Sequence, residues 1–355
     1  MSFLYLLFII ILAMVAGKRS AGKKTWLYML PLIIALSIPP ALLGDSSTDH
    51  ETYETTYRYI SRLPSLDIDN PIEIITGKIE DQEMGFVFLE RLLSLLGITS
   101  VGFFFIVALA SNALFVSSYY RFKNPIIIIL LFLASVQFLQ EPNLVRQILA
   151  VAIIFYSLRY VEDKNWKMYL LFLFLGYMIH HSAIICVMFM PLCFEIKAHK
   201  YYFWGLLAIW SFSLLVASGV MALDLSYLDA LIGLSEDYNL YLSDADVVGA
   251  GKIKFDYIYN LIIIIALLLY KDNPKFNIYF YFLVIGAALS NLTLAMPNLY
   301  RVGLYFSVTI PVMLPYIIGV AMDNKKYRVP AQVLSVFLLL YYLRFYFFNV
   351  SSFFD

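Results

Sequence analysis

Residues 168–195 read MYLLFLFLGYMIHHSAIICVMFMPLCFE, and this stretch decides how the chain is threaded. It is 28 residues long, whereas about 20 apolar residues suffice for one helix to cross the hydrocarbon core of a bilayer. His180, His181 and Ser182 stand near its centre. Irregular polar backbone at membrane depth is tolerated only where protein or water surrounds it. We therefore predict two short helices that meet at this polar step, with a cavity near His181.

The whole chain has the composition of a membrane protein. Of its 355 residues, 62% are hydrophobic and 14% are charged, and the mean hydropathy is +0.79. Soluble domains average about 45–50% apolar and about 25% charged residues, so an ordinary soluble enzyme and a disordered chain are excluded. The formal net charge of zero gives no reason to expect nucleic acid as a partner. The two cysteines provide neither a disulfide framework nor a metal-binding spacing.

Apolar runs predict an all-α integral membrane protein with about 11–12 transmembrane helices. Tyr and Trp, the usual interfacial anchors, stand near many of their ends. A shorter stretch, 85–96, is interrupted by Glu90 and Arg91, and we interpret it as an amphipathic helix on the membrane surface or against the bundle. The predicted spans are 2–17, 26–43, 100–119, 124–140, 145–161, 168–195, 201–222, 257–270, 277–296, 299–321 and 330–349.

The basic residues predict which connections face the cytoplasm. Six short connections hold 16 of the 25 Lys and Arg residues, and basic short loops stay on the cytoplasmic side. Two long stretches have the opposite character, because residues 44–83 carry a net charge of −7 and residues 223–256 one of −5. If residues 168–195 cross the membrane twice, all the loop charges agree with one topology. In that topology both termini lie outside and these two loops are extracytoplasmic. We expect a single multi-pass membrane domain over residues 1–355.

Polar residues at the predicted outer ends of the spans are the candidates for chemistry, because ionisable groups in a membrane usually face a cavity or a partner. Arg146 and Arg301 each stand at the entrance of a predicted helix, where unpaired N–H groups and the positive dipole end attract anions. The planar guanidinium matches phosphate oxygens. Two such arginines at one cavity would suit a phosphate or pyrophosphate. The alternative is a structural, ion-paired arginine, with Glu141 as a candidate partner of Arg146.

His181 is the candidate general base, because imidazole titrates near neutral pH, and a packing histidine is the alternative. A Ser182–His181 hydrolase is rejected, because adjacent helical residues point about 100° apart. The D-x-D patterns at 67–69 and 244–246 fall in the predicted outer loops, and we interpret them as solvated acids. The acidic and aromatic stretch 44–59 suits a sugar, although interfacial tyrosines explain many of its rings.

Five motifs follow one another along the chain, and together they resemble the EpsG-like branch of Wzy-type polysaccharide polymerases over roughly residues 1–325. Two features depart from the pattern, since His180 precedes His181 and Glu141-Pro142 precedes Asn143. The motifs are Thr48-Asp49-x-x-x-Tyr53, Glu83-x-Gly85-Phe86, Asn143-x-x-Arg146-Gln147-x-x-Ala150, His181-Ser182-Ala183, and Arg301-x-x-x-Tyr305-Phe306 followed by Pro311.

The resemblance implies a GT-C-like glycosyltransferase bundle in the bacterial plasma (inner) membrane, with its active site facing the periplasm or the outside. The donor and acceptor would be oligosaccharide repeat units on undecaprenyl pyrophosphate, joined into O-antigen or exopolysaccharide without a metal or a cofactor. The resemblance also implies a chain-length regulator as a partner. The implied site residues are His181, Asp49 and Glu83 as catalytic residues, Arg146, Arg301, Asn143 and Gln147 at the pyrophosphate, and Tyr53 and Tyr305 at the sugar.

Three other functions compete with this interpretation. An O-antigen ligase would use similar arginines, but the placement of the N-x-x-R-Q and H-S-A motifs favours a polymerase. A flippase or exporter of lipid-linked glycans would need polar residues through both leaflets, whereas the inner halves of the predicted spans are almost purely apolar. A membrane acyltransferase would need an acidic partner for His181, such as an H-x₄-D pattern, and no convincing one is present.

Overall fold

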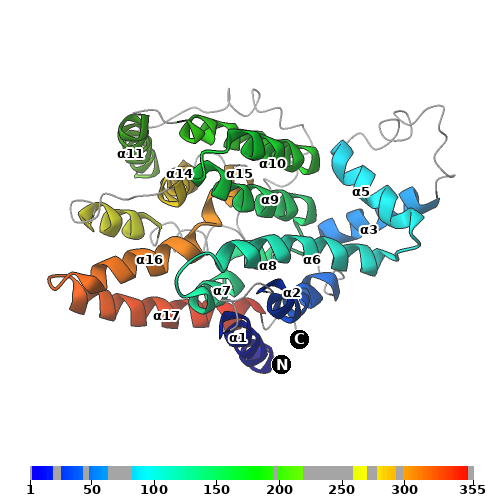
Figure 1. Ribbon diagram of the computed structural model, residues 1–355, viewed down its shortest axis with the longest axis horizontal. Coiled ribbons are helices and arrows are strands. Elements are labelled where there is room, and N and C mark those ends of the chain that lie inside the picture. Colours follow the sequence, from blue (N-terminus) through cyan, green and yellow to red (C-terminus); the bar gives the residue numbers. More distant parts are fainter. Residues whose placement is uncertain are drawn as a thin grey trace. The chain divides into compact units, whose positions relative to one another are not determined.

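The computed structural model describes residues 2–18, 25–42, 48–62, 82–194, 198–218, 259–269, 278–292 and 299–350, and within these ranges it contains helices and turns but no strand (Figure 1). The chain divides into two compact units. The first unit comprises Met1–Cys193 with Leu334–Asp355, and the second comprises Phe194–Val333. The predicted loop 223–256 lies outside the described residues.

Most helices of the first unit coincide with predicted apolar runs. The run 100–119 forms one helix, and the run predicted from 145 forms a helix that begins at Val145. The helices are α1 (Ser2–Lys18), α2 (Thr25–Leu42), α3 (Thr48–Arg62), α5 (Met84–Leu95), α6 (Ser100–Tyr119), α7 (Pro125–Leu133), α8 (Val136–Leu139), α9 (Val145–Glu162), α10 (Trp166–Ile179), the 3₁₀ helix η2 (His181–Cys193) and the later part of α17 (Arg328–Val350).

Several described helices are apolar enough for a membrane. By length and composition, Ser100–Tyr119 and Arg328–Phe347 can each cross a bilayer, and the bent pair Arg301–Ser307 and Ile310–Asp323 is a third candidate. Other apolar helices, including α10 and η2, are shorter. The predicted all-helical, membrane-type architecture is therefore supported, whereas the twelve crossings and their sidedness stay predictions.

The helix break predicted within residues 168–195 is confirmed. α10 ends at Ile179, and His180 adopts an extended backbone with φ −155° and ψ 118°. The next segment, η2, begins at His181 and is a 3₁₀ helix of 13 residues. Runs of 3₁₀ helix longer than three or four residues are uncommon. At about 2.0 Å per residue, such a segment extends about 26 Å, longer than an α-helix of the same residue count.

α10 and η2 form an antiparallel hairpin around this break. The Tyr169 hydroxyl donates a hydrogen bond to the Cys186 carbonyl at 2.6 Å. Farther from the break, the Lys164 ammonium donates to the Leu192 carbonyl at 2.8 Å. Because the contact farther from His180 joins residues that are farther apart in sequence, the two segments run in opposite directions. The hairpin carries the His-His step at its tip.

One predicted span and one predicted loop differ from the structure. The span 124–140 is interrupted after Leu133, and the Ser135 hydroxyl accepts the Phe138 N–H at 3.4 Å in the first turn of α8. The predicted loop 44–83 contains α3, whose buried residues follow one helical face. This amphipathic spacing was present in the sequence but was hidden by the high local charge. The buried residues of α3 are His50, Tyr53, Tyr57 and Ile60.

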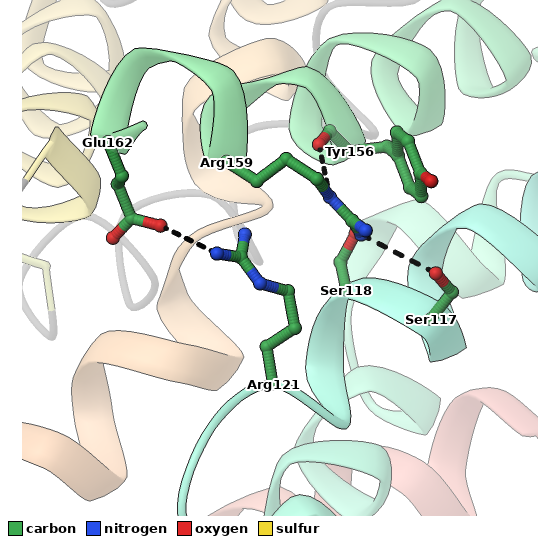
Figure 2. Close-up of polar contacts among 6 residues, drawn as sticks. All are labelled: Ser117, Ser118, Arg121, Tyr156, Arg159 and Glu162. Atoms are coloured by element: carbon green, nitrogen blue, oxygen red, sulfur yellow. Dashed lines mark hydrogen bonds and ion pairs between the residues drawn. The ribbon is translucent and has the colours of Figure 1, made fainter. Parts of the chain in front are cut away.

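The far ends of α6 and α9 lie together in the first unit (Figure 2). Arg121, just after α6, pairs with Glu162 at the end of α9 over 3.3 Å. Arg159 donates to the Ser117 and Ser118 hydroxyls at 3.4 and 3.5 Å. The two basic connections that follow these helices therefore share one end of the unit, in agreement with the charge scheme. Arg146 stands at the opposite end of α9, about 20 Å away by helical rise.

The second unit contains α11 (Ala198–Ala217), a helix at Tyr259–Leu269, α14 (Ile278–Leu292), α15 (Leu299–Ser307), α16 (Ile310–Asp323) and the start of α17. A polar network joins three of these helices. Trp210 donates to Asn260 at 2.7 Å, Asn260 donates to Asn291 at 2.7 Å, and Asn291 donates to Ser213 at 3.0 Å. In a membrane, lipid tails are as apolar as the helix side chains, so burial of apolar surface does little to hold helices together. Hydrogen bonds between polar side chains of neighbouring helices therefore stabilise their association.

The predicted span 299–321 is bent rather than straight. α15 ends at Ser307 and α16 starts at Ile310, with a bend of 42° between them. Pro311 stands in the first turn of α16, where a residue without a backbone N–H is tolerated but cannot continue the hydrogen bonds of a preceding helix. The proline therefore gives a physical reason for the bend.

Candidate functional site

A buried ion pair at the start of α9 forms the centre of the candidate site. Arg146, the second residue of α9, donates from Nη1 to Glu83 Oε2 at 2.6 Å. Its Nε donates to the Tyr53 hydroxyl at 3.2 Å, and its guanidinium carbon lies 5.3 Å from the centre of the Tyr53 ring. The Glu83 side chain is 8% exposed and that of Arg146 is 21% exposed. The cation is thus held firmly from one side and still reaches solvent.

Glu83 is positioned by the close approach of α5 to the tip of the hairpin. It precedes α5 with an extended backbone, at φ −69° and ψ 136°. Two residues later, a Cβ on Gly85 would lie 2.6 Å from the Met178 carbonyl oxygen of α10. Only glycine fits this contact, which explains the glycine of the Glu83-x-Gly85 motif. The same contact brings the carboxylate to the helix break.

Both histidines of the hairpin tip contact Glu83, but in different ways. His180 Nδ1 lies 2.8 Å from Glu83 Oε1, which makes an ion pair when the imidazole is protonated. The backbone N–H of His181 donates to the same oxygen at 3.2 Å. The His181 ring instead packs 4.8 Å from the ring of Tyr177 and is exposed. The imidazole that faces the carboxylate is therefore that of His180.

These partners keep Glu83 ionised. Burial by itself raises its pKa, but the hydrogen bond with His180 and the charge of Arg146 outweigh burial and lower the pKa from 4.5 to about 2. A group accepts protons efficiently in catalysis when its pKa lies near the working pH. Glu83 is accordingly suited to orienting the histidine and the arginine rather than to taking a substrate proton itself.

Arg146 does not pair with Glu141, the partner considered from sequence. Glu141 is 3% exposed, and both its oxygens accept from Asn112 Nδ2 at 3.2 Å. Burial raises the Glu141 pKa well above 4.5, against the opposing effect of the Asn112 hydrogen bond. The interpretation of Arg146 as an ion-paired residue is correct in that it has a carboxylate partner, but the partner is Glu83.

The remaining predicted residues lie around this centre or apart from it. Asn143 donates to Gln140 at 3.1 Å just before α9, and Gln147 is buried on its first turn. Asp49 is the second residue of α3, but its side chain lies outside the described residues. In the second unit, Arg301 is the third residue of α15 and Tyr305 is buried on that helix. A cavity shared by Arg146 and Arg301 stays a prediction.

Two residues near this centre were not assigned a role from sequence. His180 was noted only as a departure from the family pattern, and nothing in one sequence tells which of two adjacent imidazoles meets a carboxylate. Glu90 was noted only as an interruption of an apolar stretch, yet it is fully buried on α5. A lone acid within an apolar run was the available signal, since such a residue is rarely buried without a reason.

The helices and this cluster define a class: a helical membrane-type protein in which a buried carboxylate fixes an arginine at the start of a helix. Comparison with known families specifies it further. The chain matches the EpsG family over residues 25–355, essentially its whole length, and it belongs to that family, a Wzy-like family of polymerases. Comparisons with curated proteins and with solved structures gave no match.

Proposed function

We propose that this protein is a polysaccharide polymerase that joins oligosaccharide repeat units carried on undecaprenyl pyrophosphate at the outer face of the bacterial plasma membrane. Membership of the EpsG family supports the polymerase class. The observation that carries the chemistry is the 2.6 Å pair between Arg146 and Glu83 at the first turn of α9. Substrate, carrier and mechanism in this proposal rest on that pair together with the family.

Arg146 would stabilise the leaving group. When the acceptor hydroxyl oxygen bonds to the anomeric carbon of the donor, the bond from that carbon to the pyrophosphate oxygen breaks, and its electron pair stays on the pyrophosphate. A preorganised cation at the developing charge lowers the barrier, and its effect is greatest where water is scarce. The N-terminal N–H groups of α9 would add to the guanidinium, since the N-cap residue Leu144 makes no side-chain hydrogen bond to them.

His180 would accept the proton that the acceptor hydroxyl loses. With Nδ1 held toward Glu83, the neutral imidazole presents Nε2 as its acceptor, and the imidazolium that forms is stabilised by the carboxylate. Glu83 then orients both the base and the leaving-group cation. His181 as the base stays a prediction from sequence. Replacing each histidine separately distinguishes the two assignments.

The decisive experiment expresses full-length variants in a host that lacks its own polymerase and reads the glycan ladder on a gel. Arg146→Ala should abolish long chains at normal protein level, and Arg146→Lys should remain impaired because a point charge lacks the planar fork. The matched control is Arg159→Ala on the same helix, which should keep a normal ladder. Normal ladders from both Arg146 variants would refute the proposed role of this arginine.

A further inference from the structure

A second carboxyl group lies on α5, the helix that Glu83 precedes. Glu90 follows Glu83 by seven residues and stands in the middle of this helix. Glu90 is 0% exposed. Neither of its oxygens has a hydrogen-bond partner among the described residues. Because buried carboxyl groups are normally paired or hydrogen-bonded, this one calls for an explanation.

The surroundings of Glu90 are apolar and adjoin Arg146. Phe86 and Leu93, which lie one turn before and one turn after Glu90, belong to the same buried cluster as Val145 of α9. Val145 is the immediate neighbour of Arg146. The Glu90 side chain therefore enters the apolar layer on which the site arginine rests.

The charged and titratable groups around Glu90 are few among the described residues. Arg146 on α9 and Tyr57 on α3 interact with it electrostatically. The Tyr57 hydroxyl donates to a backbone carbonyl at 2.8 Å, and Arg91, next to Glu90 on α5, donates to another at 2.7 Å. α10, which also packs against α5, presents the uncharged Met178 there. Arg146 is thus the cation that an ionised Glu90 would attract.

Burial holds this carboxyl in its neutral form at neutral pH. Burial raises the pKa of Glu90 from 4.5 to about 8, and the charge of Arg146 opposes the rise. Glu90 therefore loses its proton only as the pH rises through about 8. Once ionised in an apolar layer, a carboxylate gains more from a guanidinium partner than it would in water.

We propose that Glu90 is a positioning residue for Arg146: while neutral it leaves the guanidinium to Glu83 and the substrate, and when ionised it competes for it. The inference rests on the proposed polymerase function for its effect on turnover, but the coupling of Glu90 to Arg146 does not. Polymerisation by the wild-type protein should then fall on the alkaline side about tenfold per pH unit above the titration of Glu90.

The first test measures polymer formation by purified full-length protein in liposomes, supplied with lipid-linked repeat units extracted from the polymerase-deleted host. The readout is the rate at about pH 9 divided by the rate at about pH 7, taken within each variant. Glu90→Gln should raise this ratio about tenfold over the wild type. Glu141→Gln, the matched change at a buried carboxyl away from the Arg146 pair, should not. Equal ratios for Glu90→Gln and the wild type would overturn the proposal.

The second test needs no activity. Infrared spectra should contain a protonated carboxyl band that disappears as the pH rises through about 8 and that is missing from Glu90→Gln. Arg146→Ala should move this transition to higher pH, because a cation that favours the ionised form is removed. Arg159→Ala should leave it in place. An unmoved transition in Arg146→Ala refutes the coupling. A moved transition, combined with a wild-type protein that makes no polymer in the liposome assay, refutes the proposed function alone.

Discussion

The two ends of α9 each carry an arginine, and their environments differ. At the start of the helix, Arg146 is fixed by a carboxylate with 8% exposure at 2.6 Å. At the end, Arg159 lies 3.5 Å over the Tyr156 ring and donates to hydroxyl groups, beside the half-exposed pair of Arg121 and Glu162 (Figure 2). A count of basic residues treats both ends alike, but only the first holds its cation in a low-dielectric setting.

The helix dipole sharpens this difference. A cation is stabilised by about 0.3–1 kcal/mol at a helix C-terminus and is disfavoured at an N-terminus. Arg159 and Arg121 therefore stand where the helix dipole stabilises a cation, which is sufficient reason for their presence. Arg146 stands where the dipole opposes it, and Glu83 offsets that cost. A residue placed against its local preference and then fixed by a buried partner is typical of a functional site.

The largest effect on stability is expected at Glu83. Glu83→Ala leaves the Arg146 cation buried without its carboxylate and should lower the free energy of unfolding by about 2–4 kcal/mol. This is somewhat less than the cost of about 3–5 kcal/mol for breaking a fully buried pair, because Arg146 retains some solvent access. The measurement is thermal unfolding of the purified protein in detergent. The double variant with Arg146→Ala should lose less than the sum of the single variants. Additive losses would show that the pair is not coupled.

The lowered Glu83 pKa also predicts a pH dependence. Because the pKa falls from 4.5 to about 2 on folding, Glu83 stabilises the native state above pH 4.5, and this stabilisation disappears as the pH drops toward 2. The shift corresponds to about 3 kcal/mol, which agrees with the loss expected for Glu83→Ala. Acidification should therefore destabilise the wild type more than Glu83→Gln in the same detergent. Parallel curves for the two proteins would contradict the pKa assignment.

The next effect, on activity rather than on folding, separates the two histidines. His180→Ala should lower the polymerisation rate about 10²- to 10⁴-fold, as expected for loss of a general base. His181→Ala should reduce it much less, because that imidazole packs on Tyr177. The readout is the liposome assay, with unfolding curves as the control for structure. A reversed order would restore the base assignment made from sequence, and two mild effects would direct attention to Asp49.

The sequence predicted the long elements well because apolar runs and helix boundaries are local properties. α6 matches its predicted run, and the break at His180 was predicted from length and polarity alone. Two predicted spans proved to be interrupted, since a continuous apolar run does not reveal a turn such as that at Ser135. α3 was missed because acidic residues outweighed the Tyr53, Tyr57 and Ile60 spacing in a judgement based on average polarity.

The candidate site was predicted in composition but not in pairing. Glu83, Arg146 and Tyr53 were each selected from motifs, yet their mutual contacts span separations of 63 and 93 residues. No local pattern specifies which of several acids meets a given arginine, so Glu141 was a reasonable candidate partner and was wrong. The burial of Glu90 could not be predicted from local sequence either, because it depends on how α3, α5 and α9 pack rather than on its neighbours in sequence.

The smallest effect is expected at the other end of α9. Arg121 and Glu162 are 35% and 33% exposed, and ion pairs of this kind contribute about 0–1 kcal/mol, less at high salt. Arg121→Ala and Glu162→Ala should each change the free energy of unfolding by less than about 1 kcal/mol, with the difference reduced at high salt, and both should give normal ladders. A lost ladder from either variant at normal protein level would mean that this end also serves the chemistry. The burial of the partner would then no longer distinguish a functional arginine from one with a purely structural role.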